Sequence, residues 1–193
     1  MKQMEEKIRK EGKVLPGGIL KVGGFLNQQI DTDFLKDMGR EIARLFSDGG
    51  VTKILTIEAS GIAVAVAAGM TMGVPVVFAK KHKTSNVDGD PYSTVVHSFT
   101  HNMDYTVVVS RDYLTAADRV LLVDDFLANG AALRGLIELV RLSGATLVGA
   151  CAAIEKRFQG GGDKLRAEGV RVESLAVIEK MTDGEILFSH SEK

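Results

Sequence analysis

The sequence predicts an α/β fold with a mainly parallel central sheet flanked by helices. Its strongest strand segments, residues 53–57, 119–123 and 146–154, are continuously apolar rather than alternating, which is typical of strands covered on both faces. Helical segments lie between these strands along the chain, as they do in connections between parallel strands. The length of 193 residues suits a single domain spanning 1–193.

The composition excludes some classes of protein. The chain has 24 Lys and Arg against 25 Asp and Glu, a formal net charge of −1, so no overall positive charge favours general nucleic-acid binding. The single cysteine, Cys151, cannot form an internal disulfide, and its apolar strand predicts a core position. The opening MKQMEEKIRKEGK contains no apolar leader, so we expect a cytoplasmic protein.

One segment is long enough to cross a membrane. Residues 59–79 form a run of 21 without a charged side chain. Gly61, Gly69, Gly73 and Pro75 interrupt this run, and its apolar residues are mostly Ala and Val. We therefore expect a loop, a buried helix and a strand here, and no contact with a membrane.

The first 50 residues are predicted to form two helices. Residues 2–11 are strongly charged and favour a short helix, whereas 14–27 are apolar, broken by four glycines, and show no regular periodicity. Residues 31–46 have the apolar spacing of an amphipathic helix, which Gly49 and Gly50 end. The apolar face of this helix consists of Phe34, Leu35, Met38, Ile42, Leu45 and Phe46.

A strand–helix–strand unit follows. The apolar strand 53–57 leads through the turn 58–61 into an Ala-rich helix, and residues 74–79 form a second apolar strand. The next segment, 80–90, is polar and basic (KKHKTSNVDGD), and it favours a mobile surface loop.

The second half is predicted to add two hairpins and a further strand–helix–strand unit. Aromatic and β-branched residues at 92–99 and 105–110 flank a polar turn, which indicates an antiparallel hairpin. The strand 119–123 precedes a helix at 131–143 that Gly144 ends. Beyond the strand 146–154, we expect a short helix near 163–168, after the glycines 160–162, and a hairpin of 171–180 and 186–189 turned at Asp183-Gly184.

The strongest functional signal is RVLLVDDFLANGAA, at residues 119–132. A buried strand delivers Asp124 and Asp125 at its carboxyl end, which is the edge where open α/β sheets bind ligands. The helix start at Asn129, Gly130 and Ala131 offers unpaired backbone N–H groups, a positive dipole end and small side chains, which together favour a phosphate. Carboxylates can accept hydrogen bonds from sugar hydroxyls, and the neighbouring backbone N–H groups can bind a phosphate. Together they suit a sugar phosphate.

This segment resembles the signature of the phosphoribosyltransferases, which bind 5-phosphoribosyl-1-pyrophosphate (PRPP). It departs from the commonest version, which has Thr where Asn129 stands and Gly-Thr where Ala131-Ala132 stand. The resemblance implies a type I phosphoribosyltransferase fold with a flexible lid loop and a small hood, formed by about 1–30 and 155–193. It assigns the PRPP phosphate loop to Ala128, Asn129, Gly130, Ala131 and Ala132.

The turn Glu58-Ala59-Ser60-Gly61 resembles the pyrophosphate-binding loop of the same family. Successive backbone N–H groups in such a turn can form an anion nest. The resemblance also implies a non-proline cis peptide in this loop, which we predict near Ala59-Ser60. By itself, this sequence also suits an ordinary turn between strand and helix.

The basic segment Lys80-Lys81-His82-Lys83 resembles the family's lid. Lys81 or Lys83 could neutralise departing pyrophosphate and closure could exclude water, although a solvated run of charges is the alternative. His97 and His101 do not share a helix face, so no metal site is expected there. Mg²⁺ is expected to be held mainly by PRPP oxygens and water rather than by protein ligands.

Four further segments, LKVGGFLNQQID, FAKKHK, VDDFLANG and IEKRFQ, resemble the bacterial branch of the family that uses xanthine, and the similarity covers nearly the whole chain. The resemblance implies Leu20, Asn27 and Lys156 as base contacts, and a homodimer. The Lys156 ammonium only donates, so it can bind a purine 6-oxo group but not the amino group of adenine. Asn27 could donate to the 2-oxo group of xanthine or accept from the 2-amino group of guanine. Phe158 could stack on the base or belong to the core.

The sequence therefore predicts a purine salvage enzyme of the glycosyltransferase class. It would transfer the phosphoribosyl group of PRPP to xanthine and release pyrophosphate and xanthosine 5′-monophosphate. Asp124 and Asp125 would orient the ribose and offset positive charge at C1. A PRPP-binding regulator, an enzyme preferring guanine or hypoxanthine, and a pyrimidine enzyme remain alternatives; a Rossmann dehydrogenase lacks its G-x-G-x-x-G turn.

Overall fold

The structure, a computed structural model, describes residues 1–81, 90–98, 103–182 and 185–189. Its centre is a six-stranded sheet with the strand order β10-β9-β8-β7-β3-β4. Neighbouring strands from β4 to β9 run parallel, and only β10 is antiparallel to its neighbour. The mainly parallel sheet expected from the sequence is therefore confirmed. Its strands are β3 (Lys53–Ile57), β4 (Val76–Ala79), β7 (Arg119–Leu127), β8 (Thr146–Lys156), β9 (Val172–Thr182) and β10 (Glu185–Phe188).

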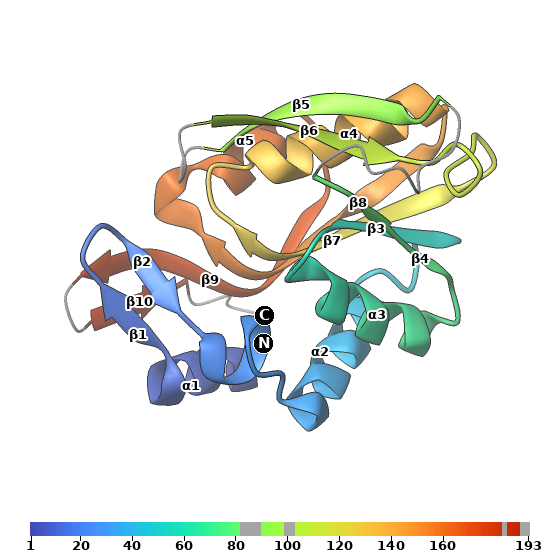
Figure 1. The fold of residues 1–193 in the computed structure, drawn as a ribbon. Coiled ribbons are helices and arrows are strands. Elements are labelled where there is room, and N and C mark those ends of the chain that lie inside the picture. Colours follow the sequence, from blue (N-terminus) through green and yellow to red (C-terminus); the bar gives the residue numbers. More distant parts are fainter. Residues whose placement is uncertain (82–89, 99–102, 183–184, 190–193) are drawn as a thin grey trace.

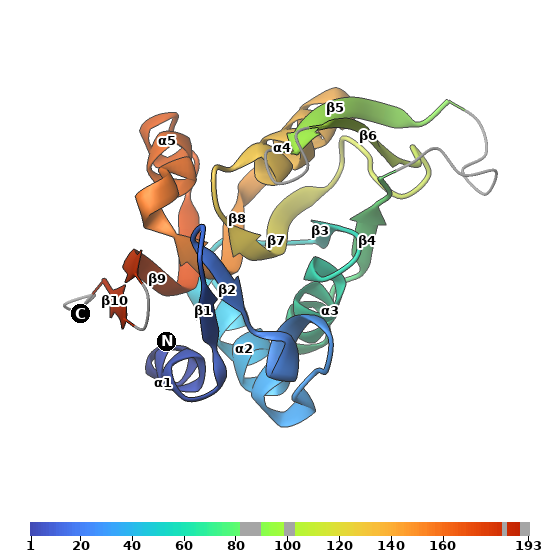
Figure 2. The ribbon, with the colours of Figure 1, turned by 60° about the vertical axis from the view of Figure 1, so that its left-hand side comes forward.

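Helices cover both faces of the sheet (Figures 1 and 2). On one face lie α2 (Thr32–Leu45) and α3 (Gly61–Met72), which approach closely because Gly39 has no side chain to meet the backbone of Ala67. On the other face lie α4 (Ala131–Ser143) and α5 (Gly161–Ala167). Two separate apolar clusters, one on each face, hold these layers together.

An antiparallel hairpin of β5 (Tyr92–Ser98) and β6 (Met103–Val109) lies over α4. A side chain on Gly135 of α4 would collide with Val96 of β5, so glycine allows the hairpin to approach the helix. Backbone hydrogen bonds of 2.9 Å in both directions between Lys80 and Val108 join β6 to the chain just after β4. The hairpin therefore lies above the carboxyl end of β4.

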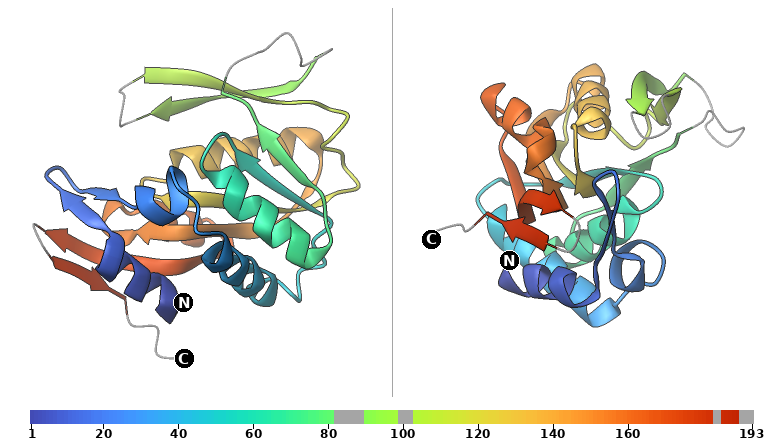
Figure 3. Two further views of the ribbon diagram at one scale, coloured as in Figure 1. Left: turned by 60° about the horizontal axis from the view of Figure 1, so that its bottom comes forward. Right: turned by 90° about the vertical axis from the view of Figure 1, so that its left-hand side faces the viewer.

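The N-terminal segment lies beside the C-terminal strands, although the two are far apart in the sequence (Figure 3). This segment contains α1 (Lys2–Glu11), β1 (Lys13–Leu15), β2 (Ile19–Lys21) and a short π-helix, η1 (Gly23–Asn27). Arg9 Nη1 donates to the carbonyl oxygen of Ile186 at 3.2 Å and lies over the ring of Phe188. The apolar stretch 14–27, which has no clear periodicity, thus forms most of a small hairpin and a short π-helix.

The differences from the predicted elements are small and local. The strand β7 continues to Leu127, so both aspartates belong to the strand rather than to the turn after it. The strand β4 begins at Val76 instead of residue 74, directly after Pro75, which has no N–H to donate. The short helix α5 begins at Gly161 rather than near 163.

Other expectations concern the apolar run and the loops. The run 59–79 forms a turn, the helix α3 and the strand β4, as expected, and among the described residues no helix is long and apolar enough to cross a membrane. Cys151 is buried in β8, where burial raises the pKa of its thiol, so its predicted core position is confirmed. The predicted mobile loop falls mostly on 82–89, and the turns of both hairpins on 99–102 and 183–184, outside the described residues.

Candidate active site

The paired carboxylates stand where β7 approaches its end, in the middle of the sheet. Asp124 is only 5% exposed, and its Oδ1 accepts a hydrogen bond of 2.9 Å from the backbone N–H of Asp125. Burial raises the pKa of Asp124 well above its usual range, the neighbouring Asp125 raises it further, and Lys81 partly opposes this. Burial and the adjacent carboxyl group therefore both disfavour the ionised form of Asp124.

A short loop with a glycine directly before the helix precedes α4. Gly130 has a φ of 86°, a left-handed conformation that suits glycine, and the helix starts at the next residue. The side-chain oxygen of Asn129 accepts a hydrogen bond of 3.0 Å from the N–H of Ala131. This contact corrects the expectation that the N–H of Ala131 would be unpaired, because Asn129 caps the helix start as an Asx turn.

The glycines 160–162 support this loop, which sequence reasoning did not anticipate. The N–H of Gly161 donates to the carbonyl oxygen of Ala128 at 3.1 Å. A side chain on Gly161 would collide with the backbone of Ala128, Asn129 and Gly130. The three consecutive glycines are the only sign of this contact in the sequence, and they do not indicate which segment they pack against.

The turn 58–61 lies next to the carboxylates. The peptide bond between Glu58 and Ala59 is cis, one bond before the pair named in the prediction. A Cβ on Gly61, the first residue of α3, would lie 2.9 Å from Oδ1 of Asp124. Ser60 precedes the helix without a side-chain cap. The turn from one strand and the carboxyl group from another thus meet at one edge of the sheet.

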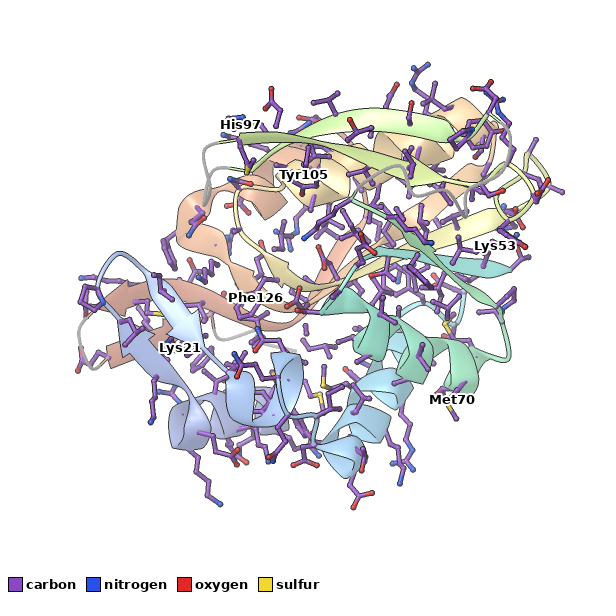
Figure 4. All side chains as sticks on the ribbon, in the orientation of Figure 1. Lys21, Lys53, Met70, His97, Tyr105 and Phe126 are labelled. Atoms are coloured by element: carbon purple, nitrogen blue, oxygen red, sulfur yellow. The ribbon has the colours of Figure 1, made fainter. Side chains whose placement is uncertain are left out.

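Lys81 reaches the same edge from the end of β4. Its backbone N–H donates to Oε1 of Glu58 at 2.6 Å, which joins two segments 23 residues apart. Its ammonium group lies 5.6 Å from the ring centre of Tyr105 on β6. Burial and the charge of Asp124 raise the pKa of Tyr105. Tyr105, labelled in Figure 4, is a site neighbour that its position in a predicted hairpin did not reveal; His82 and Lys83 lie outside the described residues.

The residues expected to bind a base lie around the tip of the N-terminal hairpin. Lys156 Nζ donates to the carbonyl oxygen of Gly18 at 2.9 Å and lies 5.4 Å from the ring centre of Phe126. Burial lowers the pKa of this lysine. Leu20 is 5% exposed and packs in the core beneath the hairpin. Sequence reasoning did not identify Phe126, which follows the two aspartates and is labelled in Figure 4.

Two other base candidates are more open. Phe158 is 44% exposed, and its ring lies 3.8 Å from where a Cβ of Gly18 would stand. The alternative that Phe158 is a core residue is therefore wrong. Asn27 is the last residue of η1 and has an exposed side chain. The side chains of both residues are exposed, and the ring of Phe158 lies beside the hairpin tip at Gly18.

No group of three or more metal-binding side chains occurs within the part of the chain that the structure describes. His97 on β5 forms a 2.6 Å hydrogen bond with Asp104 on β6. His101 lies outside the described residues.

Comparisons with known proteins agree with this geometry. Residues 27–180 match the phosphoribosyl transferase domain. Over 193 aligned residues, the chain is 54% identical to a xanthine phosphoribosyltransferase of Bifidobacterium longum, covering 98% of this chain and all of the relative. It is 51% identical over 188 residues to one of Pseudomonas savastanoi, covering 97% of this chain and all of that relative. An adenine phosphoribosyltransferase from Giardia lamblia has the same fold, with a TM-score of 0.76, 21% identity, and coverage of 92% of this chain and 98% of that one.

Proposed function

Because the chain belongs to the phosphoribosyltransferase family, we propose that it transfers the 5-phosphoribosyl group of PRPP to xanthine. The products would be xanthosine 5′-monophosphate and pyrophosphate, which makes the protein a purine salvage enzyme. Relatives named xanthine phosphoribosyltransferases, 46–54% identical over nearly the whole chain, support this substrate.

The observation that carries the proposal is the meeting of three ligand-binding features at one edge of the sheet. The buried carboxyl group of Asp124 and the start of α4 at Gly130 belong to one segment, and the turn at Gly61 comes from another. Two phosphate-binding backbone segments on either side of a carboxyl group match a sugar that carries phosphates at both ends. PRPP has this chemistry.

In the proposed reaction, a nitrogen of the purine attacks C1 of PRPP with inversion, through an oxocarbenium-like transition state. Asp124 and Asp125 would accept hydrogen bonds from the ribose hydroxyls and offset positive charge at C1. Residues 128–132 would hold the 5′-phosphate with backbone N–H groups. The turn of Glu58, Ala59, Ser60 and Gly61, together with Lys81, would hold the departing pyrophosphate.

Mg²⁺ is proposed to enter with PRPP. This ion keeps several waters and prefers the oxygens of substrate phosphates. The ion would therefore be held mainly by PRPP oxygens and water. When bound, it would neutralise charge on the pyrophosphate.

Base recognition is assigned to Lys156, Asn27, Leu20 and Phe158. The ammonium of Lys156 uses one donor on Gly18, and its other N–H groups can donate to the 6-oxo group of xanthine. The amide of Asn27 would donate to the 2-oxo group, Leu20 would supply an apolar wall, and the exposed ring of Phe158 would stack on the base. Adenine lacks the 6-oxo acceptor and is excluded as a good substrate.

Some properties of the assembly remain proposals. The segments 1–30 and 155–193 would form a hood over the base within a single domain. A homodimer, which the resemblance implies, has apolar surface available on α3 and β4, where Val66, Met70 and Phe78 are 40%, 80% and 42% exposed. The cytoplasmic location expected from the sequence stays a prediction.

Pyrophosphate release from PRPP and Mg²⁺, measured separately with xanthine, guanine, hypoxanthine and adenine, tests the function. Release with xanthine far above the other three is the expected result. Strong use of guanine or hypoxanthine would keep the mechanism and overturn the xanthine assignment. PRPP binding without release with any base would indicate a sensor instead of an enzyme.

A further inference from the structure

A buried hydroxyl group without a partner lies beside the reacting edge of the sheet. Thr56, on β3, is fully buried, and its Oγ1 makes no hydrogen bond to any residue that the structure describes. Buried hydroxyl groups normally have a partner, because losing water without replacement is costly. Valine would give the same branched shape without a polar atom to bury, so the hydroxyl requires an explanation.

The carboxyl group of Asp124 is an acceptor close to this hydroxyl group. Both Oγ1 of Thr56 and Oδ1 of Asp124 lie within 3 Å of the point where a Cβ of Gly61 would stand. Glycine at this helix start therefore leaves the space between a hydroxyl donor and a carboxylate acceptor free of any side chain. Rotation about a side-chain torsion is the change that a direct hydrogen bond between the two groups would need.

We propose that Thr56 is a positioning residue whose hydroxyl donates to the Asp124 carboxylate when the ribose of PRPP occupies the site. This inference rests on the proposed function, since it assigns Asp124 to the ribose. Thr56 would act only through Asp124, without contacting the substrate. Gly61 would be required because any larger residue would separate the two groups.

The charges around Asp124 explain why such a donor is needed. Asp125 disfavours the ionised form of Asp124, and Lys81 favours it. Tyr105 is also nearby, since the charge of Asp124 raises the pKa of its phenol. Burial is the largest effect and also favours the neutral acid. The positive end of the α3 dipole at Gly61 and a hydroxyl donor would together favour the carboxylate. Removing the donor would therefore raise the pKa of Asp124 further.

The test compares Thr56→Val, which keeps the shape and removes the hydroxyl, with Thr56→Ser, which keeps the hydroxyl. Thr71→Val serves as a matched control, because its hydroxyl bonds within α3 to the carbonyl of Ala67, on the exposed part of the helix. For each protein, kcat at saturating PRPP and xanthine, which reports ionisations of the substrate complex, is measured against pH. PRPP affinity is measured by calorimetry at the same pH values. The phosphates of PRPP titrate in the same way with the wild type and every variant, so a difference between two pH profiles comes from the protein.

We expect Thr56→Val to move the acid limb of the kcat profile upward by about one pH unit, a tenfold change in the proton affinity of the complex. PRPP affinity should fall by about tenfold at pH values where Asp124 is ionised in the wild-type complex. Its melting temperature should stay the same or rise, since an unpartnered buried hydroxyl is replaced by a methyl group. Thr56→Ser and Thr71→Val should keep the wild-type limb. An unchanged limb in Thr56→Val, or an equal shift in Thr71→Val, would overturn the role of Thr56.

The same experiment separates this inference from the proposed function. If the wild-type protein released no pyrophosphate with any base, the proposed function would fail, while the pH dependence of PRPP affinity would still test Thr56. If the wild-type protein were active and Thr56→Val had the same pH profile as the wild type, only the proposed role of Thr56 would be wrong.

Discussion

Lys156 Nζ donates a hydrogen bond of 2.9 Å to the carbonyl oxygen of Gly18, a residue 138 positions earlier in the chain. The bond connects the end of the central strand β8 to the tip of the N-terminal hairpin. It also orients a half-buried ammonium group, whose lowered pKa reflects burial, toward the side where Phe158 is exposed. This contact joins the proposed base site to the sheet that carries the proposed PRPP site.

Replacing Lys156 by Met should abolish selective use of 6-oxopurines. A hydrogen bond from a charged donor contributes about 1.5–3 kcal/mol, so kcat/KM for xanthine should fall by roughly 10- to 150-fold. Affinity for PRPP should change little. Steady-state kinetics with xanthine checks this, and Lys164→Met, at an exposed position of α5, is the control. Equal losses in both variants would contradict the role of Lys156.

Asn27 should determine selectivity at the 2-position of the purine. An aspartate in its place can only accept when ionised, so Asn27→Asp should lose xanthine activity and gain guanine activity relative to it. We expect the ratio of kcat/KM for xanthine to that for guanine to fall by about tenfold or more. The comparison is made with both bases at one pH. An unchanged ratio would show that Asn27 does not contact the 2-position.

Gly161→Ala should weaken PRPP binding. The added methyl group would collide with the backbone of Ala128 and Asn129, so the phosphate loop would have to shift. We expect KM for PRPP to rise about tenfold, with xanthine affinity, measured by calorimetry, nearly unchanged. Gly24→Ala is the matched control, since a Cβ there has nothing within 4 Å. A normal KM for PRPP in Gly161→Ala would contradict the supporting role of the glycines.

Glu155 provides a test of stability. It is fully buried, and its carboxylate accepts bonds of 2.8 and 2.7 Å from Arg166 and of 2.6 Å from Ser174. Arg166→Met would leave a buried charge without its counter-ion and should destabilise the fold by about 3–5 kcal/mol. Urea unfolding measures this loss. Adding Glu155→Leu should recover most of it, whereas Arg141→Met, at an exposed pair, should cost under about 1 kcal/mol.

Asp31 should contribute a pH-dependent part of the stability. Its hydrogen bond to Lys7 is the main cause of its lowered pKa, and the N–H of Phe34 adds to it. A lowered folded-state pKa stabilises the fold above the unfolded value, near 4, and this stabilisation is lost as the pH falls through the folded value. Melting temperatures between pH 3 and 6 should therefore decline less steeply for Asp31→Asn than for the wild type. Parallel curves would contradict this.

Several elements were predictable because their signals are local. The helices α1 and α4 begin and end where the sequence indicated, since charge, periodicity and a following glycine act within a few residues. The signature at Asp124 and Asp125 and the unusual peptide near Ala59 were also identified. The neighbours Tyr105 and Phe126 were not, because nothing in their own segments distinguishes a site residue from an ordinary strand residue.

By itself, the sequence determined the strand–helix order, the mainly parallel sheet and the segments that carry the family signature. Those features depend on hydrophobic period, turn residues and short motifs, which neighbouring residues specify together. Only the tertiary structure decided that Gly161 supports the phosphate loop, that Lys156 binds Gly18, and that Thr56 and Asp124 flank Gly61. These contacts join segments far apart in the chain, and they form only when packing of the two apolar layers places the segments side by side.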